Sequence, residues 1–263
     1  MDEAKKNNMR SHKFSKEIRK DVLKLSHLSG AAHLGSCLSV ADILAVIFTG
    51  FLNSKIKQNK FILSKGHAAM ALYSSLKNKK IISEKLFNSY CKVNSPLEEH
   101  PSPKCPGVEV ATGSLGHGIC VAGGIALANK IKRKNKSIFV LCSDGECNEG
   151  SFWEAILFAA HHKLNNLKIL IDCNKWQATG KAENILNLNS YKKKFLAMNC
   201  EVAEINGHNH KKIFNTLKKI RTKPLIVVCN TVKGKGVKFM EDDNNWHYRS
   251  PSKEDLNLAL KNL

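Results

Sequence analysis

Between residues 137 and 230, short apolar runs alternate with longer segments of helical spacing, and this alternation constrains the fold more than any other feature of the sequence. The runs that we predict to be strands are Ser137–Cys142, Leu167–Cys173, Val202–Ile205 and Leu225–Asn230. The segments between them that we predict to be helices are Glu149–His162 and Lys211–Ile220. Buried strands joined by crossover helices form a parallel sheet with helices on both faces. The chain is therefore expected to adopt a doubly wound α/β fold.

The first half of the chain is predicted to be mainly helical. The expected helices are Lys16–Leu28, Val40–Phe51 with Ser39 as its N-cap, Ala68–Lys77 and Leu115–Ile131, and a terminal helix follows at Ser252–Leu263. Phe61–Leu63 is a short apolar run, and four prolines between Ser95 and Gly113 indicate an irregular loop. With 263 residues, 43% of them hydrophobic, we expect one domain over 1–263, of which 1–14 is a flexible or helical extension.

Composition excludes several classes of protein. The N-terminus lacks the apolar run of a secretory signal, and no apolar stretch reaches the roughly 20 residues of a membrane span. We therefore expect a cytoplasmic protein that does not enter a membrane. The nine cysteines never form Cys-x-x-Cys, so neither a zinc site nor a disulfide framework is indicated. The net charge of +20 comes from lysines spread along the whole chain without interleaved aromatic residues, so we expect no nucleic-acid partner.

Two polar residues stand where predicted strands end: Asp144 is two residues after the first strand, and Asn174 directly follows the second. In a parallel sheet, ligands bind at the carboxyl ends of the strands, so both side-chain oxygens can converge on one point. A carboxylate, an amide oxygen and a backbone carbonyl suit a hard cation such as Mg²⁺, whose shell is completed by phosphate oxygens and water. Taken singly, Asp144 with Gly145 is explained as a turn and Asn174 as a strand-end cap.

The combination of motifs resembles the transketolase family over almost the whole chain, in order. The thiamine diphosphate motif is matched by Ser143-Asp144-Gly145, Glu149-Gly150, Trp153-Glu154-Ala155 and Asn174. The three histidine motifs are matched by Ser29–Gly35, Ser64–His67 and Glu99–Pro101, the segment lining the thiazolium ring by Thr112–Gly118, and the closing loop by Lys233–Gly236 with Asn245–His247. The family usually has glycine where Ser143 stands. At negative φ this change is harmless and leaves a hydroxyl for a phosphate oxygen, whereas positive φ would cost on the order of 1 kcal/mol.

The resemblance implies thiamine diphosphate as cofactor and a role for each matching residue. The implied magnesium ligands, which would also suit calcium or manganese, are Asp144, Asn174 and the Trp176 carbonyl. The implied cofactor contacts are His67, Gly113, Ser114, Leu115, Ser143, Asp144, Gly145, Glu149, Asn174 and His247. His67 and His247 would donate to the diphosphate, and His33 and His100 would hold the sugar and transfer protons. His117 stands where the family commonly has glutamine, and Glu149 and Glu154 correspond to glutamates near the family's dimer interface.

The glutamate that activates the cofactor lies, in this family, on a second α/β domain that this chain lacks. The resemblance therefore implies a partner, a C-terminal transketolase subunit that carries the pyrimidine-binding domain, together with self-association through the same fold. The implied reaction moves a two-carbon ketol unit from a ketose, a sugar or sugar phosphate, to an aldose acceptor. Four alternatives stay open: a subunit like deoxyxylulose-phosphate synthase, one of pyruvate dehydrogenase type, a non-catalytic cofactor-binding paralogue, and a basic nucleic-acid-binding protein.

Overall fold

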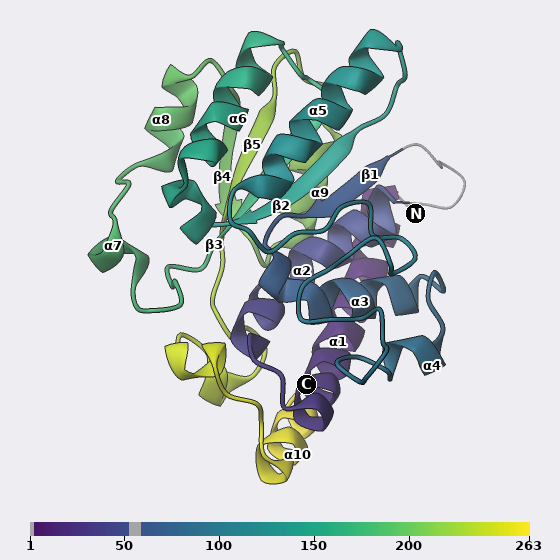
Figure 1. The fold of residues 1–263 in the computed structure, drawn as a ribbon. Coiled ribbons are helices and arrows are strands. Elements are labelled where there is room, and N and C mark those ends of the chain that lie inside the picture. Colours follow the sequence, from purple (N-terminus) through teal and green to yellow (C-terminus); the bar gives the residue numbers. More distant parts are fainter. Residues whose placement is uncertain (1–2, 53–58) are drawn as a thin grey trace.

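Five parallel strands form one sheet in the order β1-β2-β3-β5-β4 (Figure 1). The computed structural model describes residues 3–52 and 59–263. The strands are β1 (Lys60–Leu63), β2 (Ile138–Ser143), β3 (Leu167–Cys173), β4 (Glu201–Asn206) and β5 (Leu225–Asn230). After β3 the chain forms β4 at the sheet edge and then returns to place β5 between β3 and β4.

Helices cover both faces of the sheet, as Figure 1 shows. Their bounds are α1 (Glu3–Ser29), α2 (Leu34–Gly50), α3 (Ala69–Asn78), α4 (Glu84–Phe87), α5 (His117–Ile131), α6 (Gly150–His161), α7 (Ala182–Ile185), α8 (Tyr191–Ala197), α9 (His210–Lys218) and α10 (Lys253–Lys261). Alternate strand residues face opposite cores: Leu141 and Leu170 pack with α1, α2, α3 and α9, while Val140 and Ile169 pack with α5, α6 and α8. The expected doubly wound α/β fold is confirmed.

Most predicted elements lie within a few residues of the observed ones. The bounds predicted for β3 and β5 match, and Phe61–Leu63 belongs to the edge strand β1. Residues 95–113 contain neither helix nor strand, as their prolines indicated. Helix α1 starts at Glu3, well before the predicted Lys16, so residues 3–14 of the expected extension are helical; residues 1–2 lie outside the described part. The short helices α4, α7 and α8 were not predicted.

The predicted start of the second helix is wrong. Helix α2 begins at Leu34, and Ser39 is a buried residue inside it whose hydroxyl donates to Asp172 Oδ2 at 2.7 Å. The residue before the helix, His33, has φ 71°, a left-handed conformation that is unfavourable for a residue with a side chain. Its backbone N–H donates to the carbonyl of His247 at 2.7 Å. A contact with the far end of the chain therefore helps to hold this helix start.

Asp42 on α2 is the centre of a buried polar network that joins both ends of the chain. Its carboxylate is 5% exposed and accepts from both terminal nitrogens of Arg19 and from the rings of His208 and His210. Burial opposes ionisation, but these hydrogen bonds hold the pKa of Asp42 well below its usual range. Arg19 also donates to the backbone carbonyl of Lys235 at 2.8 Å. The network fixes α1 and α2 against the loop that precedes His247.

No helix in the described part of the chain is long and apolar enough to cross a membrane. The cysteines of this part are free thiols; Cys91 is exposed and the others are buried or half-buried. The sequence-based view of most cysteines as small buried residues is therefore confirmed.

Candidate active site

A cleft of about 250 Å³ opens at the carboxyl ends of the strands. Its lining brings together His33, Lys65, His67, His100, Leu115, Ser143, Asp144, Gly145, Trp176, Gln177, Ala178, Thr179 and His247. These residues come from loops that are far apart in the sequence: before α2, after β1, between α4 and α5, after β2, after β3 and after β5. Ligands of doubly wound sheets bind at this edge, so the cleft lies where the fold favours a site.

Asp144 follows β2 and carries a buried carboxylate that forms no ion pair with another described residue. It is 2% exposed, and its two oxygens accept from the backbone N–H groups of Gly145 and Lys175, both at 2.9 Å. Burial raises the pKa of Asp144 to about 7, although the charge of Lys65 acts in the opposite direction. A buried carboxylate of this kind favours a cation beside it.

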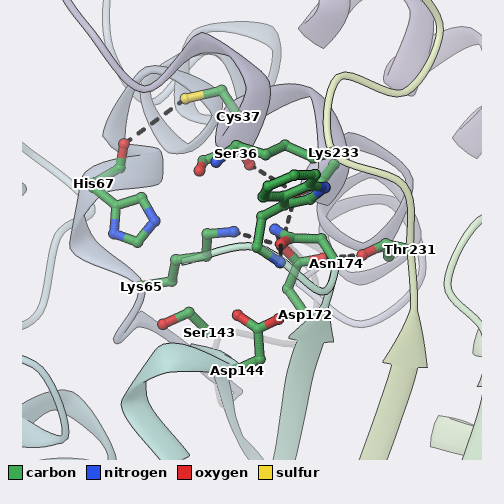
Figure 2. A network of polar contacts seen from close by, with 12 residues as sticks. Ser36, Cys37, Lys65, His67, Ser143, Asp144, Asp172, Asn174, Thr231 and Lys233 are labelled. Atoms are coloured by element: carbon green, nitrogen blue, oxygen red, sulfur yellow. Dashed lines mark hydrogen bonds and ion pairs between the residues drawn. The ribbon is translucent and has the colours of Figure 1, made fainter. Parts of the chain in front are cut away.

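The Asn174 side chain is oriented by Asp172, as Figure 2 shows. Its Nδ2 donates to Asp172 Oδ2 at 3.0 Å, and its Oδ1 accepts from the Trp176 backbone N–H at 3.0 Å. Asp172 is fully buried and also accepts from Lys65, Ser39 and Thr231. Burial opposes its ionisation, but the charge of Lys65 and the hydrogen bonds from Lys65, Thr231 and Ser39 keep the pKa of Asp172 below its usual value. The amide oxygen of Asn174 therefore has a fixed orientation.

The donor set at this edge fits a magnesium ion. Among the described residues, no three His, Cys, Asp or Glu side chains are grouped to hold a metal, which leaves a mixed set of one carboxylate, one amide and one carbonyl. Asp144 and Trp176 line the same cleft. Asn174 is buried two residues before Trp176, and its Oδ1 accepts from the Trp176 backbone N–H. Oxygen ligands of this kind, few in number, suit Mg²⁺ that is also held by phosphate oxygens.

The four motif histidines meet in the cleft. The ring centroid of His33 lies 5.4 Å from that of His67, 6.2 Å from that of His100 and 4.9 Å from that of His247. Burial lowers the pKa of His33 and of His67, the latter strongly. These two rings are therefore neutral at pH 7, so each offers one donor and one acceptor nitrogen.

Lys233 fixes the proton position on His247. The Lys233 side chain is fully buried, and its Nζ donates to Asn244 Oδ1 at 2.6 Å and to His247 Nδ1 at 3.0 Å. Burial, followed by repulsion from Lys233, lowers the pKa of His247 to about 3. Because Nδ1 accepts, the proton of the neutral ring is on Nε2, which remains a donor. Burial and the nearby Lys65 lower the pKa of Lys233 itself to about 7.

Ser143 adopts a conformation that tolerates a side chain. Its φ is not positive, so the backbone at this position does not require the glycine of the family motif. Its hydroxyl interacts with Glu146, at 3.3 Å from Oε2, rather than standing free for a phosphate oxygen. Glu146 is fully buried and also accepts from the backbone N–H groups of Ser143 and Gly116 and from the Ser64 hydroxyl. This one carboxylate holds three motif segments together.

Several residues with predicted cofactor roles lie outside the cleft lining. These are Gly113, Ser114, Glu149 and Asn174. Gly113 packs against His100, because a Cβ there would lie 2.8 Å from its ring. Ser114 is exposed, and Glu149 is the half-buried residue before α6. His117 is exposed at the start of α5. The roles assigned to these residues remain predictions.

Sequence reasoning missed four residues that organise the cleft. Lys65, Asp172, Lys233 and Glu146 carried no predicted role, although Lys65 and Lys233 stand inside motifs that match the family. Three of them had a local signal: Lys65 stands next to Gly66-His67, Asp172 stands two residues before Asn174, and Lys233 stands in the closing loop. What the sequence does not reveal is their pairing, since Lys65 and Asp172 are 107 positions apart.

Known proteins share both the sequence and the fold. The family model of the transketolase thiamine diphosphate binding domain matches residues 12–262. One subunit of the apulose-4-phosphate transketolase of Actinobacillus succinogenes is 39% identical, covering 95% of each chain, and its counterpart in Phocaeicola vulgatus is 33% identical, covering 95% of this chain and 92% of the relative. The Campylobacter jejuni transketolase structure superposes with a TM-score of 0.87 at 27% identity over 97% of this chain. This chain spans 42% of the Campylobacter protein. It belongs to the transketolase family of transferases and carries that family's thiamine diphosphate binding domain.

Proposed function

We propose that this chain is the diphosphate- and magnesium-binding subunit of a two-chain transketolase, active only with a partner that carries the pyrimidine-binding domain. The observation that carries the proposal is that His33, His67, His100 and His247 line one cleft together with the buried Asp144. The proposed assembly contains two copies of each chain, with the site between them.

The length of the relatives supports a separate subunit. The chain covers nearly all of two relatives that are themselves named as subunits, but 41% of human transketolase-like protein 2, to which it is 35% identical. A relative named as one subunit of an enzyme has a partner, and we extend that property to this chain.

Some residues of the cleft would bind the cofactor and others would bind the sugar. Asp144, Asn174 and the Trp176 carbonyl would hold Mg²⁺, while Lys65 would add positive charge beside the diphosphate. The Nε2–H of His247, fixed by Lys233, would donate to a diphosphate oxygen, as would His67. Bound thiamine diphosphate would supply the carbon nucleophile that cleaves the carbon–carbon bond of the ketose.

His33 and His100 would hold the sugar and move its protons. Their rings line the cleft with centroids 6.2 Å apart, and His33 is neutral at pH 7 because burial lowers its pKa. A neutral imidazole takes a proton from a hydroxyl as a carbonyl forms and returns it when the carbonyl is consumed. We propose a phosphorylated ketose as donor, and the names of the two relatives make apulose 4-phosphate the first to test.

Calorimetry tests the proposal. Thiamine diphosphate with Mg²⁺ is titrated into this chain alone and mixed with the candidate partner, using Asp144→Ala as control. We expect magnesium-dependent binding that strengthens with the partner and is lost in the variant, followed by ketol transfer in a coupled assay. Absence of binding in every mixture would refute the cofactor role, whereas binding without transfer from any phosphorylated ketose would favour a non-catalytic subunit.

A further inference from the structure

A second cleft, of about 350 Å³, lies at the amino ends of the strands, opposite to the first cleft. The arrows of β2 and β3 start at this end of the sheet in Figure 1. Its lining comes from three segments, residues 130–137, 165–168 and 218–221. Eight of the thirteen described residues that line it are Lys or Arg, and none is Asp, Glu or aromatic. We refer to it as the amino-edge cleft. Part of the net charge of +20 therefore gathers here, although the lysines are scattered in the sequence.

Helix ends explain part of this positive charge. Helices α5 and α9 both end beside the cleft, and cations favour the C-terminal ends of helices. Lys130 Nζ donates to the carbonyls of His162 and Lys163, at 2.7 and 3.1 Å. Lys168 Nζ donates to the carbonyl of Leu217 at 2.7 Å. These partners are neutral, so they satisfy hydrogen bonds without cancelling the charges.

Two buried polar atoms in the lining have no partner within the described residues. They are Arg221 Nε and Asn166 Oδ1, one donor and one acceptor. The other nitrogens of Arg221 are engaged, with Glu201 and with the Thr216 carbonyl, and Asn166 Nδ2 donates to the Ala126 carbonyl. Buried polar groups are almost always hydrogen-bonded, so an unpaired donor and acceptor beside one cleft indicate a missing polar partner there, either water or a ligand.

Lys168 gives the floor of the cleft a fixed cation. Its Nζ lies over the rings of Phe51 and Phe139, 5.7 and 5.0 Å from their centroids, and its backbone belongs to β3. Burial, followed by repulsion from Arg221, lowers the pKa of Lys168 to about 8. The charge of Arg221 is offset by its ion pair with Glu201 at 2.7 Å, whereas Lys168 is held in place by the Leu217 carbonyl and has no acidic partner among the described residues. A cation in a fixed position attracts an anion more strongly than a mobile surface lysine does.

The shape and lining select the class of anion. A volume of about 350 Å³ is within the range of small-molecule pockets. Single-stranded nucleic acid binds through aromatic side chains on which bases stack, and none of the described lining residues is aromatic. Phosphate groups accept several charge-assisted hydrogen bonds, which suits many Lys and Arg donors. The neighbouring Asn166 oxygen would accept a hydroxyl of the same ligand.

We propose that the amino-edge cleft binds a small metabolite that carries two or more phosphate groups. The site is separate from the cleft of the motif histidines, because the two lie at opposite ends of the strands and share no described lining residue. The proposal therefore stands independently of the function proposed above.

Inorganic pyrophosphate serves as the probe. It is titrated calorimetrically into the full chain with EDTA present, comparing wild type with Lys134→Gln/Lys136→Gln and with Lys85→Gln/Lys92→Gln. The second pair is exposed and lies outside the cleft, so it loses the same charge elsewhere. We expect a roughly tenfold or greater loss of affinity in the first variant and none in the second. Lys134→Arg/Lys136→Arg should restore binding.

Lysine acetylation read by mass spectrometry locates the anion. Pyrophosphate should protect Lys134, Lys136 and Lys219 from acetylation. Fructose 1,6-bisphosphate and ADP should compete with pyrophosphate, and the stronger competitor will show whether a sugar or a nucleotide carries the phosphates. Protection confined to Lys175, the exposed lysine between Asn174 and Trp176, would place the anion in the other cleft and overturn the proposal. Equal weakening in both double variants, absence of binding, or tighter binding of a single-stranded oligonucleotide would overturn it as well.

Discussion

Lysines lie at both ends of the strands, but Lys65 at the carboxyl ends is buried and paired, whereas Lys134 and Lys136 at the amino ends have no acidic neighbour in the described lining of their cleft. At the carboxyl edge, Lys65 is 1% exposed and forms an ion pair with the fully buried Asp172. At the amino edge, Lys134 and Lys136 line a cleft whose described lining contains no acidic side chain. A buried charge needs a partner at a fixed distance, whereas surface charges tolerate like neighbours because water and salt screen them. The charge of Lys65 is therefore already paired within the fold, whereas Lys134 and Lys136 have no acidic neighbour among the described residues that line their cleft.

The largest difference between the edges should follow from removing the partner of the buried lysine. Asp172→Asn leaves Lys65 buried without a counter-charge, which we expect to lower the free energy of unfolding by about 3–5 kcal/mol. Urea denaturation measures this loss. The double variant Asp172→Asn/Lys65→Met should recover most of it, since no unpaired charge remains. A loss below about 1 kcal/mol in the single variant would show that Lys65 does not depend on Asp172.

Removal of the second buried lysine of the carboxyl edge should act on the cofactor more than on the fold. Lys233→Met releases His247 Nδ1, so we expect thiamine diphosphate to bind roughly tenfold more weakly, with Lys235→Met from the same loop as control. Calorimetry in the assembled enzyme measures the affinity. An unchanged affinity would contradict a positioning role for Lys233.

Lys233 also predicts a pH dependence of stability. Its pKa in the folded chain is about 7, whereas a lysine in the unfolded chain has a pKa near 10.4, so the unfolded state binds more protons between these values. The contribution of Lys233 to stability should therefore rise as pH increases from about 7 to 10. Thermal unfolding across this range should show a flatter profile for Lys233→Met, and an unchanged profile would contradict the lowered pKa.

Restoring the glycine of the family motif should have a smaller effect. Ser143→Gly loses the hydroxyl contact with Glu146 and adds backbone freedom, which we expect to cost about 0.5–1 kcal/mol of stability while cofactor affinity stays within roughly twofold. Ser143→Ala separates the two causes, because it removes only the hydroxyl. A large fall in cofactor affinity in both variants would mean that the hydroxyl contacts the diphosphate after all.

The smallest change in stability is expected at the amino edge. Lys134→Gln/Lys136→Gln should alter the free energy of unfolding by no more than about 0.5 kcal/mol, because Lys134 is exposed and Lys136 is only half-buried. Thermal unfolding with and without pyrophosphate measures both the stability and the ligand effect. A loss above about 1 kcal/mol without ligand would mean that these lysines support the fold, as Lys65 does.

Local patterns predicted those parts of the fold that depend on neighbouring residues alone. The bounds of β3 and β5 could be predicted because each is a continuous apolar run between turn residues. The start of α2 could not, because it depends on a left-handed His33 that bonds to the carbonyl of His247, more than two hundred positions away. Helix-capping preferences favoured Ser39 as the N-cap, but in the fold its hydroxyl donates a hydrogen bond to Asp172.

The candidate site shows the same division. Motif spacing identified the histidines that line the cleft, but the conformation of Ser143 stayed open until the backbone was known. The pairs that hold the cleft, Lys65 with Asp172 and Lys233 with His247, join different elements. Tertiary structure determines which side chains of different elements pair, and local patterns in a single sequence do not predict these pairs.

The Asp42 network has a consequence for the order in which the chain folds during synthesis. Arg19 and Asp42 leave the ribosome early, while His208 is made 166 residues after Asp42. At about 5–20 residues per second, the two early residues wait on the order of 10 to 30 seconds for the histidines that complete their network. Long-range contacts of this kind slow folding. The loop bearing His247 is synthesised after every other segment that lines the cleft, so we expect a nascent chain to form β1, β2 and β3 before it completes the cleft of the motif histidines.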